Sequence, residues 1–129
     1  MIKMKKAKLL LWFGSIGLLP IALSYGLAPQ LSIPMLFDID IINPDLVHIF
    51  RAVMGLYLGM VFLWVWGAIN EKITKPAVYS LMFFMFGLAG GRVLSLVLDG
   101  MVNWLLEVYM LLEFGLGFSA LVIIKKMTK

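Results

Sequence analysis

The chain has 129 residues, of which 63% are hydrophobic and only 14% are charged, and its formal net charge is +4. Soluble globular domains are nearer half apolar and a quarter charged, so this composition excludes a soluble fold and favours a membrane protein. The chain contains no cysteine, which excludes disulfides, thiolate metal sites and thiol redox chemistry.

Four long apolar segments predict four transmembrane helices. A bilayer core about 30 Å thick needs roughly 20 residues per helix, and the predicted spans are residues 8–27, 46–69, 77–98 and 102–124. A basic start before an apolar run also describes a signal peptide, but no small-residue cleavage site follows here, so we expect a retained first helix. Residues 1–129 are therefore predicted to form one all-α domain, a four-transmembrane-helix bundle.

The connections between the spans are short, with one exception. Residues 28–43 are too apolar for a free loop and too short to span, which predicts an interfacial segment that covers the bundle. Asn43 suits a helix N-cap, and Pro44 suits the first turn of the second span. Residues 70–75 are predicted to form a turn, with Pro76 opening the third span.

The charges at the two ends of the spans predict the orientation. One set of termini and loops is basic and contains Lys3, Lys5, Lys6, Lys8, Lys72, Lys75, Lys125, Lys126 and Lys129. The other set contains Asp38, Asp40, Asp45 and Asp99 and no lysine or arginine. The positive-inside rule then places both termini in the cytoplasm (N-in/C-in) of a multi-pass protein of the inner, or cytoplasmic, membrane. The lysines indicate contact with anionic lipid, and nucleic acid is not a predicted partner.

A cluster of polar residues within the spans is the candidate site. It comprises His48, Arg51, Arg92, Ser95, Asp99, Asn103, Glu107 and Glu113. A charge at bilayer depth costs at least about 2.5 kcal/mol, so such side chains usually face the bundle interior and pair. A helical rise of about 1.5 Å per residue predicts that His48, Arg51, Arg92 and Glu107 converge in the outer leaflet. Glu113 is predicted deeper, near the midplane, where no basic residue falls.

The spacing of glycines predicts how these residues meet. In the second span, one stripe at three- and four-residue spacing contains His48, Arg51, Gly55, Gly59, Phe62 and Trp66. The Gly55-xxx-Gly59 and Gly87-xxx-Gly91 spacings predict close helix contacts that bring the arginines beside the carboxylates of the fourth span. The alternative is that the Arg–Glu pairs only determine register and helix order.

Two segments carry a resemblance to a known family. They are His48-x-x-Arg51-Ala52-x-x-Gly55-x-Tyr57 and Gly90-Gly91-Arg92-x-x-Ser95-x-x-x-Asp99-Gly100, followed by a glutamate (Glu107 or Glu113) and Gly117. Over nearly the whole chain they resemble a bacterial family of small four-helix membrane proteins described only as a domain of unknown function. More loosely, the layout is similar to DoxX-like four-helix proteins. The resemblance implies the fold and the position of the polar cluster, through Arg51, Arg92, Ser95, Asp99 and Glu107, but no activity.

Three functions compete at this point. The first is binding of a lipid or small amphipathic molecule whose anionic headgroup meets Arg51 and Arg92 beneath residues 28–43. The second is an oligomeric small transporter or proton-coupled exchanger that uses Glu113. The third is an accessory or scaffold subunit of a membrane complex, so the predicted partners are lipids, further copies of the chain or such a complex. Beyond these three, an intramembrane enzyme in which His48 and Glu107 do acid–base work is the least favoured alternative, because no metal-ligand cluster, nucleophile–base pair or cofactor motif is evident. No metal or cofactor is predicted.

Overall fold

The computed structural model describes the backbone of residues 2–128 and the side chains of residues 4–128. Within that range the chain forms five α-helices and no strand. They are α1 (Ile2–Gly26), α2 (Pro29–Phe37), α3 (Pro44–Ile69), α4 (Glu71–Asp99) and α5 (Trp104–Met127). All but α2 are long and apolar enough to cross a membrane. The predicted all-helical bundle of four candidate spans is thereby confirmed, and the protein is a multi-pass membrane protein.

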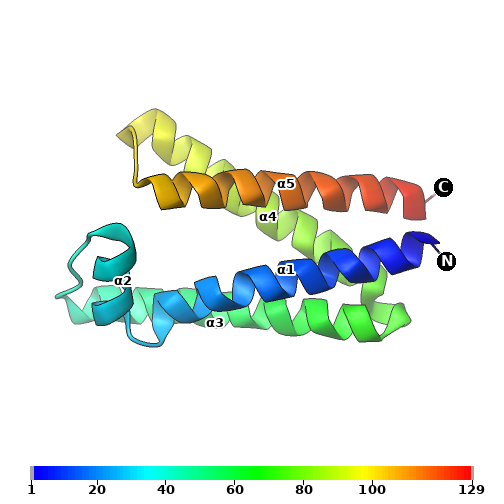
Figure 1. Cartoon of the computed structure of the whole chain (residues 1–129), viewed down its shortest axis with the longest axis horizontal. Coiled ribbons are helices and arrows are strands. Elements are labelled where there is room, and N and C mark those ends of the chain that lie inside the picture. Colours follow the sequence, from blue (N-terminus) through cyan, green and yellow to red (C-terminus); the bar gives the residue numbers. More distant parts are fainter. Residues whose placement is uncertain (1, 129) are drawn as a thin grey trace.

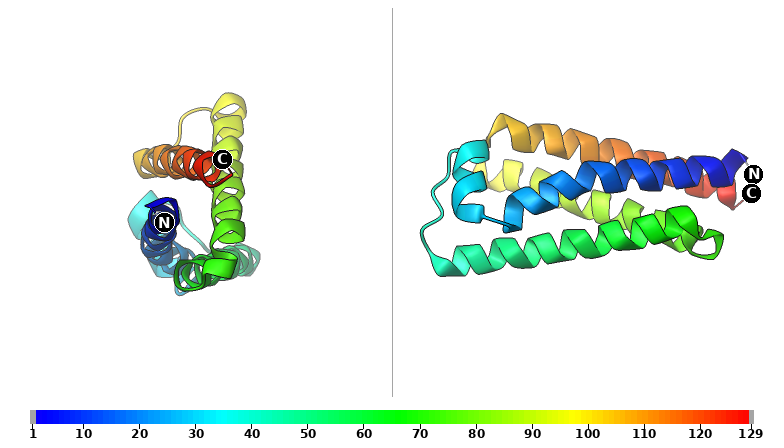
Figure 2. Two further views of the ribbon diagram at one scale, coloured as in Figure 1. Left: turned by 90° about the vertical axis from the view of Figure 1, so that its right-hand side faces the viewer. Right: turned by 60° about the horizontal axis from the view of Figure 1, so that its bottom comes forward.

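The four long helices form two pairs. Helix α1 lies along α3, whereas α4 starts beside the end of α3 and crosses diagonally to α5 (Figure 1). Both termini lie at one end of the bundle, and α2 lies at the other (Figure 2). This arrangement leaves the two pairs close together at the terminal end and farther apart at the end that α2 occupies.

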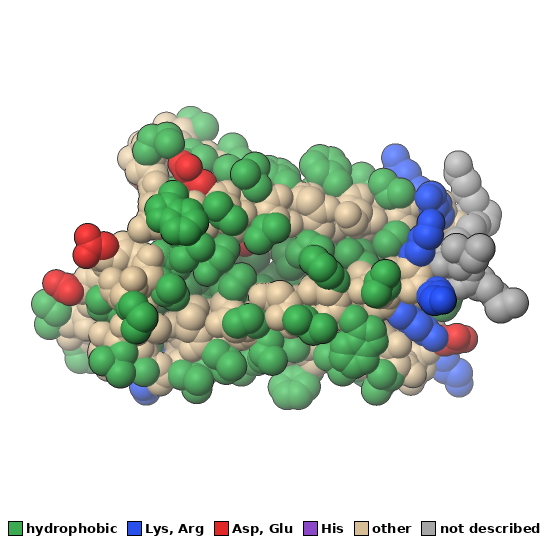
Figure 3. Space-filling view, in the orientation of Figure 1, with side chains coloured by type: hydrophobic (Ala, Val, Ile, Leu, Met, Phe, Trp, Pro, Cys, Tyr) green, Lys and Arg blue, Asp and Glu red, His purple; other side chains and the backbone are tan. Residues whose placement is uncertain are grey.

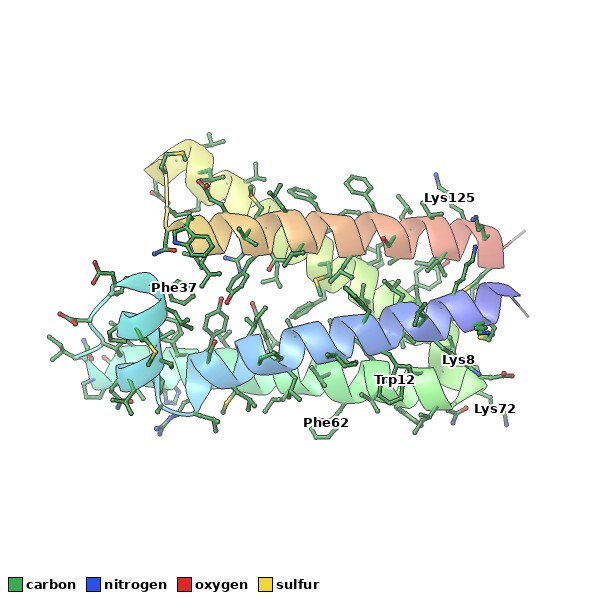
Figure 4. The ribbon with its side chains drawn as sticks, viewed as in Figure 1. Lys8, Trp12, Phe37, Phe62, Lys72 and Lys125 are labelled. Carbon is green, nitrogen blue, oxygen red and sulfur yellow. The ribbon has the colours of Figure 1, made fainter. Side chains whose placement is uncertain are left out.

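Charge divides the bundle in the same way. Lysine side chains gather at the end that holds the termini, and acidic side chains gather mainly at the opposite end (Figure 3). Lys8, Lys72 and Lys125 mark the basic end (Figure 4), which we call the lysine end; the opposite end, which holds Asp99, is called the aspartate end. The side chains of Lys3 and Lys129 lie outside the described residues. Between the two ends, exposed apolar side chains face outward, as lipid requires.

The lysine end is closely packed. Leu11, Trp64 and Leu81 are fully buried there, and the indole Nε1 of Trp64 donates a hydrogen bond to Ser80 Oγ at 3.0 Å. Gly67 has no room for a side chain, because a Cβ atom at that position would collide with the Cβ of Ala77. The backbones of α3 and α4 therefore approach closely at this end.

The turn between α3 and α4 is shorter than predicted. Helix α4 begins at Glu71, so Asn70 alone separates it from α3 and the predicted turn over residues 70–75 is wrong. The side chain of Asn70 accepts a hydrogen bond from the backbone N–H of Lys72 at 3.0 Å, and Thr74 Oγ1 donates to the carbonyl of Gly67 at 2.6 Å. These bonds satisfy backbone groups at both helix ends, and Pro76 is accommodated inside α4.

The interfacial segment contains the short helix α2. Ile33, Phe37 and Ile41 are buried against the long helices, and Phe37 points from α2 towards the space between the two helix pairs (Figure 4). On its other side, Leu31 and Met35 are 71% and 80% exposed. The segment therefore fills the wider end of the bundle with one apolar face and presents a second apolar face outward.

The glycine spacings do not make the predicted contacts. Gly55, Gly59, Gly87 and Gly91 have open space where a Cβ would lie, so the prediction of close helix contacts at these positions is wrong. The physical reason is that α3 packs through a different stripe, which contains Tyr57, Val61, Trp64 and Ala68. The predicted stripe of α3, including His48 and Arg51, is exposed instead.

Candidate functional site

An ion pair between α4 and α5 is the centre of the polar cluster. Arg92 Nε donates to Glu113 Oε1 at 2.7 Å, and Arg92 Nη2 donates to Glu113 Oε2 at 3.2 Å. The two side chains are only 20% and 10% exposed, respectively. Parallel bonds from a guanidinium to a carboxylate are among the stronger hydrogen bonds in proteins, so this pair rigidly joins the two helices.

The expectation that Glu113 has no basic partner is therefore wrong. Side chains on a helix point towards its N-terminus, and α4 and α5 run in opposite directions. Arg92 thus reaches towards the lysine end, while Glu113 reaches towards the aspartate end. The two groups meet although their Cα atoms were placed at different depths, because helical rise alone does not include the reach of the side chains.

Aromatic rings surround the ion pair. The guanidinium carbon of Arg92 lies 5.9 Å from the ring centroid of Tyr109, within the range of a cation–π contact. Tyr109 contacts Phe37 of α2 at 6.4 Å between ring centroids, Phe37 contacts Tyr25 at 6.3 Å, and Tyr25 contacts Tyr57 at 5.6 Å. These contacts connect all five helices around the pair.

Sequence reasoning missed the role of these aromatic residues. The sequence places Phe37 only within the apolar segment of residues 28–43, and no motif distinguishes Tyr109. Tyr57 does close the first segment that resembles a known family. A tyrosine buried in an apolar span needs a polar partner for its hydroxyl group. The presence of Tyr25, Tyr57 and Tyr109 in three apolar spans is therefore the sequence signal for a polar group between these helices.

A groove of about 400 Å³ lies between α4 and α5. Arg92, Ser95 and Glu107 supply its polar atoms, and Gly87 and Gly91 form part of its wall. The rest of the lining includes Leu88, Leu96, Val102, Leu106 and Met110. We call it the α4–α5 groove. It brings together three of the predicted site residues, Arg92, Ser95 and Glu107, on an otherwise apolar surface.

A smaller cavity lies on the other side of the ion pair. It measures about 90 Å³ and its lining includes Glu113, Tyr57 and Tyr109 with apolar side chains of α1, α4 and α5. Arg92 lines the α4–α5 groove, and Glu113 lines this inner cavity. The ion pair thus lies between the two cavities.

His48 and Arg51 do not join this cluster, so the predicted convergence is wrong for these two residues. Both lie on the exposed face of α3, and the Nε of Arg51 donates to the carbonyl of Gly26 at 3.3 Å. They line a separate groove of about 620 Å³ between α2 and α3, which we call the α2–α3 groove. It shares no lining residue with the α4–α5 groove.

The remaining predicted residues have local roles. Ser95 Oγ donates to Asp99 Oδ2 at 3.2 Å within α4. Asn103 is the N-cap of α5 and accepts a hydrogen bond from the backbone N–H of Leu105 at 2.9 Å. Among the described residues, no group of three or more histidine, cysteine, aspartate or glutamate side chains is placed to hold a metal ion. The arrangement offers hydrogen-bond donors and acceptors beside an apolar surface.

One comparison with known proteins gives a match. The family described as "Domain of unknown function (DUF4345)" matches residues 6–124, which is almost the whole chain. No curated protein matches the chain, and no solved structure does. The matched region includes most of each of the four long helices and all lining residues of both grooves.

Proposed function

We propose that this chain, which belongs to the DUF4345 family of unknown function, binds a lipid or another small amphipathic molecule in the α4–α5 groove. The observation that carries the proposal is the composition of that groove. Arg92, Ser95 and Glu107 face an apolar lining within a volume of about 400 Å³. Binding sites for small molecules commonly combine an apolar wall with a few polar groups that orient the ligand.

The charges of the groove suggest which polar group the ligand carries. Arg92 is already paired with Glu113, and no cation among the described residues lies within ion-pair distance of Glu107. An anionic headgroup would therefore meet an uncompensated carboxylate. A neutral or cationic group that donates hydrogen bonds to Glu107 suits the groove better. For this groove we therefore propose a neutral or cationic headgroup in place of the anionic one predicted from the sequence.

The position in the membrane is part of the proposal. The lysine end suits the cytoplasmic side of an inner membrane, so the α4–α5 groove would open in the outer leaflet. Membrane lipids are then the most abundant candidate ligands, and a second copy of the chain could cover the groove. The bacterial source and the looser likeness to DoxX-like proteins stay predictions.

The alternatives have less support. The proton-coupled exchanger was motivated by a Glu113 without a basic partner, and Arg92 supplies that partner. The accessory or scaffold subunit remains an untested prediction, because no described feature identifies a partner protein. A purely structural role for the Arg92–Glu113 pair is compatible with ligand binding in the groove beside it.

Two glycines in α4 provide a matched test. Gly91 lines the groove and Gly90 does not, yet both have open space where a side chain would lie. Native mass spectrometry of protein released from its own membranes should detect a neutral or cationic amphipathic adduct on the wild type and on Gly90→Leu. Gly91→Leu should lose the adduct, because its side chain fills the groove. Retention by Gly91→Leu, or no adduct on the wild type, would contradict the proposal.

A further inference from the structure

The α2–α3 groove differs from the α4–α5 groove in its charge. Among the lining residues, Arg51 is the only arginine or lysine, and there is no aspartate or glutamate. Gln30 of α2 adds an amide group, and Ile42, Val47 and Ala52 are apolar lining residues. A groove of this composition suits an anion that has an apolar extension.

The Arg51 guanidinium makes one hydrogen bond and has further donors available for a ligand. Its Nε donates to the carbonyl of Gly26 at 3.3 Å. The terminal nitrogens Nη1 and Nη2 have no carboxylate or other hydrogen-bond partner among the described residues. A guanidinium with two free terminal nitrogens matches two oxygens of one phosphate group.

Arg51 lies near the aspartate end of α3. Arg51 lies seven residues into α3, about 10 Å from the first residue of that helix. Helical side chains point towards the helix N-terminus, which for α3 is the aspartate end, so the guanidinium extends back towards the membrane surface. Arg92, on the antiparallel helix α4, points the opposite way and is paired.

From this composition, geometry and depth we infer that the α2–α3 groove binds the phosphate of an anionic glycerophospholipid. Arg51 contacts the phosphate, Gln30 and His48 donate hydrogen bonds to the headgroup, and the apolar lining receives the first part of an acyl chain. This site is separate from the α4–α5 groove and does not depend on the function proposed there.

The test uses the full chain in nanodiscs that contain equal amounts of phosphatidylglycerol and phosphatidylcholine. Native mass spectrometry counts the lipids that stay bound after release. The wild type should retain phosphatidylglycerol preferentially, and Arg51→Gln should lower that preference about fivefold, as expected for one lost contact between a cation and an anionic lipid. Ala52→Leu, which narrows the groove without changing charge, should lower it too.

Controls separate this site from general attraction and from effects of mutation elsewhere. Lys72→Gln removes the same charge at the lysine end and should keep the preference, and so should Gly90→Leu, at a residue that lines neither groove. Inorganic phosphate should not displace the lipid, because it lacks the apolar part. An unchanged preference in Arg51→Gln, or equal displacement by inorganic phosphate, would overturn the inference; the second result would indicate a site for soluble phosphate.

Discussion

The two ends of the bundle are built from the same long apolar helices but differ in how closely these helices pack. At the lysine end, Trp64 and Leu81 are fully buried, and Gly67 brings the backbones of α3 and α4 together. At the aspartate end, α4 has moved away from α3 (Figure 1), and α2 and both grooves lie there. Direct helix packing thus joins α3 to α4 at the lysine end, whereas α2 fills the wider space at the aspartate end and polar side chains line the grooves there.

The two ion pairs show the same contrast. Lys8 and Glu71 meet at the lysine end at 3.0 Å with side chains 30% and 70% exposed. Arg92 and Glu113 meet inside the bundle with side chains 20% and 10% exposed. The surrounding water weakens the first pair, whereas the second pair has few other partners available.

The largest expected effect comes from breaking the inner pair. Glu113→Gln should lower the free energy of unfolding by about 3 kcal/mol, because it leaves the guanidinium of Arg92 shielded from water without a countercharge. Denaturant titration in detergent micelles measures this change. The double variant Arg92→Met/Glu113→Leu should recover most of the loss, since neither charge then remains.

Glu71→Gln is the matched control for that experiment. It should cost less than about 1 kcal/mol, as is usual for an exposed ion pair. Equal losses in Glu113→Gln and Glu71→Gln would mean that the two ends do not differ in the way described.

The second effect concerns the close approach of α3 and α4. Gly67→Ala should lower the free energy of unfolding by about 1–3 kcal/mol, because the added methyl group collides with Ala77. Gly59→Ala adds the same atom to the same helix where space is open, and it should be neutral or slightly stabilising. Thermal unfolding of both variants in the same detergent compares them, and similar midpoints would contradict the close packing.

The smallest effect should come from one hydrogen bond at the lysine end. Trp64→Phe removes the 3.0 Å bond to Ser80 and part of a buried ring, and it should cost about 1 kcal/mol or somewhat more. Trp66 is 52% exposed on the lipid-facing side of the same helix, so Trp66→Phe should cost much less. Denaturant titration distinguishes the two, and a larger loss in Trp66→Phe would reverse the assignment of the packed face.

The long helices could be predicted because lipid admits only continuous apolar runs, and those runs are visible in the chain. The rotation of each helix about its own axis could not be predicted from the sequence. In a soluble protein, polar residues mark the outer face of a helix, but α3 is apolar on both sides. Residue spacing alone therefore predicts that the stripe through His48, Arg51 and Gly59 faces the bundle interior, although these residues are exposed on the outer surface of α3.

The sequence predicted part of the candidate site. Arg92, Ser95 and Glu107 were expected together and share one groove. The pairing of Arg92 with Glu113 depends on the opposite directions in which side chains of antiparallel helices point. The contact between Phe37 and Tyr109 depends on how α2 folds back into the bundle, which hydropathy does not describe.

Because Asn70 alone connects α3 to α4, a small rotation of α4 about this residue produces a large displacement at its far end. Its 29 residues extend about 44 Å from that point, so a rotation of about 5° there would displace the Asp99 end by about 4 Å. Transmembrane helices adjust their tilt when bilayer thickness changes. A change of bilayer thickness would then change the distance between α4 and α3 at the aspartate end, and α5 would follow α4, because the Arg92–Glu113 pair joins these two helices.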